Sequence, residues 1–77
     1  MMVLFFARAR DLAGTERVEI AGGMSVGELR HHLRRMYPKL AAVLEKSAFA
    51  INDDLADDAA LIPGDAEVAL LPPVSGG

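Results

Sequence analysis

Cysteine is absent from the 77 residues of this chain. Disulfide bonds and zinc sites built from thiolates are therefore excluded. A chain of this length lies close to the lower limit at which a single hydrophobic core is stable without such cross-links. We therefore expect one domain that is held together by packing alone.

Long apolar runs are also missing. Hydrophobic residues make up 52% of the chain, but no run approaches the roughly 20 residues that a membrane span requires. Residues 1–6 lack the charged region and the length of a signal peptide. These absences predict a cytoplasmic protein that makes no use of a membrane.

Positive charge is in deficit, because 8 Lys and Arg residues face 11 Asp and Glu residues, for a net charge of -3. This balance argues against general affinity for nucleic acid or for anionic membranes. The last third of the chain is acidic, with Asp53, Asp54, Asp57, Asp58, Asp65 and Glu67. These side chains are interpreted as a solvated surface or, alternatively, as an acidic flank beside the C-terminal tail that steers a basic partner.

Motifs for cofactors and metals are missing as well. No Gly-rich loop with a lysine is present to hold ATP, so we expect no bound cofactor. His31 and His32 are adjacent, so on a helix they point to different sides and cannot chelate one ion together. We therefore expect no metal, and we interpret the paired aspartates of the last third as turn and surface residues.

The chain ends in an apolar run, two prolines and two glycines, Leu70-Leu71-Pro72-Pro73-Val74-Ser75-Gly76-Gly77. Consecutive prolines fix φ and remove two backbone donors, so a strand must end near Leu71 and the chain must leave it stiff. Fully extended, residues 72–77 reach on the order of 20 Å at about 3.3 to 3.6 Å per residue. Glycines without a Cβ can pass a narrow channel.

We therefore predict a folded domain over residues 1–71 and an extended tail over residues 72–77. The carboxylate of Gly77 is the candidate reactive group, with Gly76 beside it. The alternative is a frayed chain end with no function.

Regular elements can be assigned from the pattern of apolar residues. Strands are predicted at residues 3–7, 17–20, 48–51 and 67–71, with a further short strand before the turn at 63–65. Residues 8–15 read as a loop or short helical turn that ends at Gly14. Ser25 and Glu28 form a capping box, which begins a helix that runs to about Met36. A second short helix is predicted from Pro38 to about Lys46.

This order of elements predicts an α+β domain in which one main helix crosses a mixed sheet. A helical crossover returns the chain parallel to its first strand, so the last strand should lie beside the first at the centre of the sheet. The predicted architecture is the β-grasp, or ubiquitin-like, fold.

The first strand is apolar at every position from Val3 to Ala7, which is typical of a strand covered on both faces. A domain this small covers one face with its own helix. The other face is closed either by irregular chain or by a partner subunit.

The start of the chain, residues 3–15, the turn at Gly64-Asp65 and the end, residues 71–77, together resemble the small subunit of molybdopterin synthase, a sulfur carrier of the MoaD/ThiS family. The resemblance spans the chain. A Gly-Gly end alone would be shared with ubiquitin-like modifiers and with the thiazole-pathway carrier. Around Ala59-Ala60-Leu61 no diagnostic residue is found.

The resemblance implies that an ATP-using activating enzyme adenylates the Gly77 carboxylate, which is then converted to a thiocarboxylate. The tail next inserts into the large subunit of molybdopterin synthase, in a heterotetramer, and gives its sulfur to precursor Z, cyclic pyranopterin monophosphate. The large subunit supplies most of the catalytic groups, so this chain is not expected to be an enzyme by itself.

The resemblance also favours a partner over the open face of the first strand. The residues expected to bind it are Phe5 or Phe6, Leu61, Leu71, Pro72, Pro73, Val74 and Ser75. Alternation alone does not decide which phenylalanine faces outward. Two further functions stay open: a carrier for thiazole synthesis, tRNA thiolation or protein conjugation, and a ubiquitin-like binding module with an inert tail.

Overall fold

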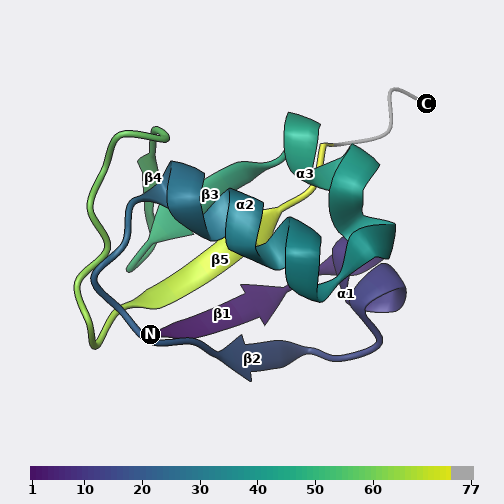
Figure 1. Ribbon diagram of the computed structural model, residues 1–77, viewed down its shortest axis with the longest axis horizontal. Helices are drawn as coiled ribbons and strands as arrows, with labels where there is room; N and C mark the ends of the chain where they lie inside the picture. Colours follow the sequence, from purple (N-terminus) through teal and green to yellow (C-terminus); the bar gives the residue numbers. More distant parts are fainter. Residues whose placement is uncertain (74–77) are drawn as a thin grey trace.

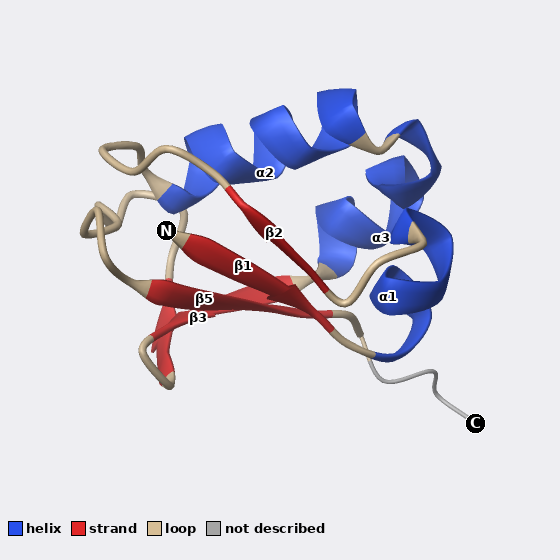
Figure 2. Ribbon diagram, turned by 90° about the horizontal axis from the view of Figure 1, so that it is seen from below, coloured by secondary structure: helices blue, strands red, loops and turns tan. Residues whose placement is uncertain are grey.

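A mixed sheet of five strands runs through the part of the chain that the computed structural model describes, residues 1–73 (Figure 1). Its strands are β1 (Met2–Phe5), β2 (Arg17–Glu19), β3 (Ala48–Ile51), β4 (Asp54–Ala56) and β5 (Glu67–Leu71). The helices are α1 (Ala7–Ala13), α2 (Val26–Met36), the 3₁₀ turn η1 (Pro38–Leu40) and α3 (Ala41–Lys46). Figure 2 shows α2 and α3 on the same side of the sheet, which leaves the other side without a helix.

The order of strands in the sheet is β2-β1-β5-β3-β4. β5 lies between β1, to which it is parallel, and β3, to which it is antiparallel. The prediction that the last strand lies beside the first at the centre is therefore confirmed. This arrangement is the β-grasp fold.

Helix α2 begins as the sequence predicts. The Glu28 backbone N–H donates to the Ser25 hydroxyl at 3.2 Å, and the Ser25 backbone N–H donates to the Glu28 carboxylate at 2.9 Å. This reciprocal pair satisfies two backbone donors that the first turn of a helix leaves without partners. Leu29 and Leu33 are fully buried, but Met36 is 42% exposed, so the apolar stripe ends one turn earlier than predicted.

Two other helical segments differ in detail from the prediction. The expected loop or turn at residues 8–15 is largely a helix, α1, which already begins at Ala7, a residue predicted in the first strand. Gly14 caps this helix with a left-handed φ of 75° that glycine adopts without strain. The segment from Pro38 to Lys46 divides into η1 and α3 rather than forming one helix. Leu40, Val43 and Leu44 nevertheless share the buried face that their spacing predicts. Among residues 1–73, no helix combines the length and the apolar character needed to cross a membrane.

Candidate functional site

The tail is rooted in the central strand of the sheet. Leu71 is the last residue of β5 and pairs with Ala48 of β3, while Leu70 is flanked by Phe5 on β1 and by Phe49 on β3. Because proline has no N–H donor, the ladder cannot continue past Leu71 into Pro72 and Pro73. The chain therefore leaves the sheet from its most extensively paired strand. Val74, Ser75, Gly76 and Gly77, which the sequence singles out, lie outside the described residues.

Arg30 fixes the chain that precedes Ala48. Its guanidinium group donates to the Ser47 carbonyl at 2.9 Å and also to the Leu44 carbonyl, near the end of α3. It forms an ion pair with Asp58 at 2.7 Å and lies 4.9 Å from the centre of the Phe49 ring. One side chain of α2 thus ties the end of α3 to the beginning of β3, which is the strand that holds the root of the tail.

The two faces of the sheet differ in cover. Register places Phe5, Leu70, Phe49 and Ala56 in one row across four strands, beneath the helices. The neighbouring row, on the opposite face because side chains alternate along a strand, holds Leu4, Ala69, Ala50 and Leu55. We call this helix-free side the open face. Leu71 belongs to it as well, two residues beyond Ala69 on β5.

Phe5 is not available for docking. Its side chain is 2% exposed, and its ring packs edge-on against Tyr37, with ring centres 5.5 Å apart. Phe6, the residue that precedes α1, is 45% exposed. The structure therefore removes Phe5 from the expected docking residues, because alternation along β1 turns Val3 and Phe5 together into the core.

Leu61 and Leu55 are the most exposed large hydrophobic side chains of residues 1–73, at 76% and 75%. Leu61 forms an isolated bridge with Ser25 at the start of α2, so it is not part of the rows that carry Leu71. Leu55 lies in the open face, although the sequence did not single it out. Its signal was the short strand before the turn at 63–65, but only the register of that strand shows where Leu55 points.

A hollow lies beside the open face, where β1 passes into α1. It is lined by Leu4, Phe5, Phe6, Arg10, Glu16 and Arg17. Arg17 stands opposite Leu4 in the register of β1 and β2. Apolar and cationic side chains therefore meet at this edge of the face.

The acidic turn that follows β3 does not flank the tail. The backbone N–H of Asn52, the residue before Asp53, donates to the Glu67 carbonyl at 2.8 Å, which places this turn at the start of β5. The tail leaves from the other end of β5, at Leu71. For Asp53 and Asp54 the expectation of an acidic flank beside the tail is therefore wrong, because β5 separates this turn from the tail by its full length.

Asp57 and Asp58 differ, because they follow Ala56 at the other end of β4. Asp58 binds the same Arg30 guanidinium that donates to the Ser47 carbonyl, next to the partner of Leu71.

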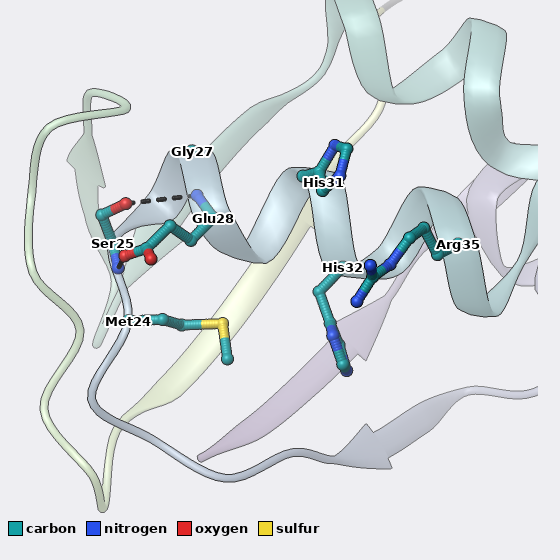
Figure 3. Close-up of a pocket in the computed structure, with 7 residues that line it drawn as sticks. All are labelled: Met24, Ser25, Gly27, Glu28, His31, His32 and Arg35. Atoms are coloured by element: carbon teal, nitrogen blue, oxygen red, sulfur yellow. Dashed lines mark hydrogen bonds between the residues drawn. The ribbon is translucent and has the colours of Figure 1, made fainter.

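A second groove lies on α2 and is lined by Met24, Ser25, Gly27, Glu28, His31, His32 and Arg35 (Figure 3). Figure 3 shows His31 and His32 diverging from the helix, as their spacing predicts. The hydrogen bonds that Glu28 accepts from the Ser25 backbone and side chain lower its pKa. Within residues 1–73 no three His, Asp or Glu side chains are placed to hold one metal ion. Glu28 is thus committed to capping the helix.

Comparison with known proteins agrees with this geometry. The model of the ThiS family matches residues 3–77. The molybdopterin synthase sulfur carrier subunit of Escherichia coli is 43% identical over 79 residues, which cover 97% of this chain and 96% of that protein.

Two solved structures have the same fold. The small archaeal modifier protein 1 of Methanosarcina acetivorans superposes with a TM-score of 0.82 at 26% identity, over 99% of this chain and 94% of that one. A chain in the complex of subunits 1 and 2 of the molybdopterin-converting factor from Helicobacter pylori superposes with a TM-score of 0.72 at 32% identity, with both chains fully covered.

Proposed function

Because this chain belongs to the ThiS family, we propose that it is the sulfur-carrier small subunit of a molybdopterin synthase. The observation that carries the proposal is the path of β5, which lies between two strands and runs directly into Pro72-Pro73. This path holds the root of the tail on a rigid element. The identity of 43% to a molybdopterin synthase sulfur carrier subunit supports the choice of reaction.

The reacting group in this proposal is the Gly77 carboxylate. An ionised carboxylate is a poor electrophile, so an ATP-dependent activating enzyme first joins it to AMP and releases pyrophosphate. A sulfur nucleophile then attacks the acyl carbon, AMP leaves, and the terminus becomes a thiocarboxylate. Neither step requires a cysteine in this chain, and the sequence has none.

The loaded tail, residues 72–77, then enters the large subunit and delivers its sulfur to cyclic pyranopterin monophosphate. The thiocarboxylate sulfur bonds to a carbon of the precursor and displaces an oxygen substituent there, so that a thioester joins the tail to the pterin. Water then attacks the acyl carbon, the acyl carbon–sulfur bond breaks with the sulfur left on the pterin, and the Gly77 carboxylate is restored for another cycle. The groups that bind the pterin belong to the large subunit in this proposal, because this chain contributes the sulfur.

The open face is the proposed docking surface for the large subunit. Phe6 and Leu55 expose apolar surface, and Leu71 joins the face to the root of the tail. Contact through this face would bury apolar area while it directs the tail toward the partner. The Helicobacter pylori complex, which pairs a similar chain with subunit 2, supports a partner of this kind.

Intact-mass spectrometry tests the chemistry. The chain is incubated with the activating enzyme, ATP and a sulfur donor, and a control omits ATP. We expect a mass gain equal to the exchange of one oxygen for one sulfur, located on the C-terminal peptide. An unchanged mass with an activating enzyme that loads its own carrier would refute the proposal.

Conjugation to proteins is the second candidate function, favoured by the structural similarity to a small archaeal modifier protein. The same acyl adenylate, attacked by a lysine amine instead of sulfur, would give an isopeptide bond. The two functions are separated by what accumulates in the presence of ATP. A thiocarboxylate indicates sulfur transfer, whereas higher-mass conjugates that carry a Gly77-derived branch indicate modification.

A further inference from the structure

Charged side chains of both signs lie on the segments near the root of the tail, with cations in excess. The end of β5 from which the tail leaves lies between the end of β1, which leads into α1, and the start of β3, which follows α3. The start of β2 lies one strand further away, beyond β1 (Figure 1). Four cationic side chains lie on these segments, and we call them the basic rim: Arg8, Arg10, Arg17 and Lys46. Three exposed anions lie on or next to the same segments: Asp11, Glu16 and Glu45. The opposite end carries the acidic turn that follows β3.

Register places the rim around the root of the tail. Phe5 pairs with Leu70, and Arg8 follows three residues later on α1. Lys46 ends α3, two residues before Ala48, the partner of Leu71. Arg10 and Arg17 line the hollow beside Leu4 on the other side.

The rim is exposed, and its charges are not neutralised by close ion pairs. All four side chains are exposed to solvent. Within residues 1–73 the only ion pair joins Arg30 and Asp58, which lie outside the rim. Glu16 lines the same hollow as Arg10 but forms no ion pair with it. The four cations of the rim outnumber the three anions beside them, so this end carries a small excess of positive charge on a chain whose net charge is -3.

We propose that the basic rim steers the docking of an acidic surface on the large subunit of molybdopterin synthase, around the opening that receives the tail. The inference rests on the proposed function and adds the chemistry of the partner's surface. Exposed charges contribute little to final affinity, but complementary fields raise the association rate and orient the encounter. An acidic surface attracts the rim and repels the turn at Asp53 and Asp54, so the end of the domain that holds the root of the tail turns toward the partner.

The steering role of the rim is tested by stopped-flow measurement of the rate at which the chain associates with the large subunit from the same organism. The quadruple variant R8Q/R10Q/R17Q/K46Q should associate about tenfold more slowly at low ionic strength. Its rate should depend little on salt, whereas the wild-type rate should fall as salt approaches about 0.15 M and screening sets in. Dissociation rates should differ less than about twofold, since the apolar face is unchanged.

A matched pair of double variants locates the effect. R10Q/R17Q removes two charges from the rim, and R34Q/R35Q removes two exposed charges from the end of α2. Net charge is equal in the two variants. We expect association about threefold slower for R10Q/R17Q and nearly unchanged for R34Q/R35Q. Equal slowing of both would show an effect of net charge alone and would overturn the inference.

Other outcomes also decide the question. A wild-type association rate that is independent of salt would overturn the proposed steering by the rim, while it would leave the sulfur-carrier function intact. A second outcome would also overturn the inference and leave the sulfur-carrier function intact. In that outcome the wild-type chain binds total tRNA and the quadruple variant does not, while both associate with the large subunit at the same rate, so the rim would serve RNA. A wild-type chain that never binds the large subunit would remove the proposed function and this inference with it.

Discussion

Two neighbouring rows of the same sheet, each apolar in all four strands, have opposite surroundings. The row of Phe5, Leu70, Phe49 and Ala56 lies under the helices, and its two central side chains are fully buried. The row of Leu4, Ala69, Ala50 and Leu55 lies on the open face, with alanines at its centre and Leu55 75% exposed. Large central side chains fill a core, whereas small ones leave a flat surface. Apolar composition alone therefore does not indicate which face of a sheet is closed by its own chain.

The largest expected effect separates function from stability completely. Deleting Gly77, or adding one residue after it, should abolish sulfur loading and transfer, because the acyl group is then missing or displaced. The melting temperature should not change, since neither row is altered. Intact mass after activation and thermal unfolding by circular dichroism measure the two quantities. Normal transfer by either variant would contradict the proposed reactive group.

A second comparison contrasts the rows directly. Phe49→Ala should lower the free energy of unfolding by about 3–5 kcal/mol, because it opens a cavity in the row beneath the helices. Leu55→Ala, on the adjacent strand but on the open face, should lower the free energy of unfolding by less than about 0.5 kcal/mol. Urea denaturation measures both variants. Similar losses at the two positions would show that the open face contributes to the core after all.

Leu71→Asp should affect binding more than folding. Leu71 is only partly buried, so the loss of stability should be about 1 kcal/mol. A charge placed at the centre of an apolar interface should cost about 2 kcal/mol or more of binding free energy. Calorimetric titration with the large subunit measures the affinity. Leu61→Asp is the matched control, because Leu61 lies outside the open face, and it should bind normally.

If Leu71→Asp lowers the melting temperature strongly but binds as well as the wild type does, Leu71 belongs to the core. If Leu61→Asp weakens binding as much as Leu71→Asp does, the docking surface extends to the start of α2.

The smallest expected effect concerns α2, the helix that Glu28 caps and that covers the row of Phe49 and Leu70. The pKa of Glu28 is lowered by its hydrogen bonds with Ser25, so its stabilising effect is present at neutral pH and is lost as pH falls through the folded-state pKa. Glu28→Gln keeps the hydrogen bond without the charge, so it should melt slightly below the wild type at about pH 7 and almost equally at about pH 3. Thermal melts at both values measure this difference. A difference in melting temperature between Glu28→Gln and the wild type that is larger at about pH 3 than at about pH 7 would contradict the stabilising role of the Glu28 charge.

Much of the fold follows from local signals in the sequence. Ser25 and Glu28 mark the start of α2 three residues apart, and Pro72-Pro73 marks the end of the last strand. The central place of β5 follows from the parallel return that a helical crossover imposes. These features are predictable because each depends on near neighbours or on a general rule of topology.

The site was less predictable because it depends on register and on distance in space. Phe5 and Phe6 are chemically identical neighbours, so only the alternation observed along β1 distinguishes them. Leu55 was missed for the same reason, because its face depends on how β4 pairs with β3. The turn at Asp53 and Asp54 precedes the tail in sequence, yet β5 carries the chain away from it before the tail begins.

The place of β5 also has a mechanical consequence. A force applied along residues 72–73 acts parallel to β5, so the hydrogen bonds to β1 and β3 are loaded together in shear. Peeling an edge strand breaks such bonds one after another, and this route is closed to a strand with neighbours on both sides. A protein that withdraws or threads the tail would therefore meet its greatest resistance at Leu71, and the domain would be carried along intact rather than unravelled.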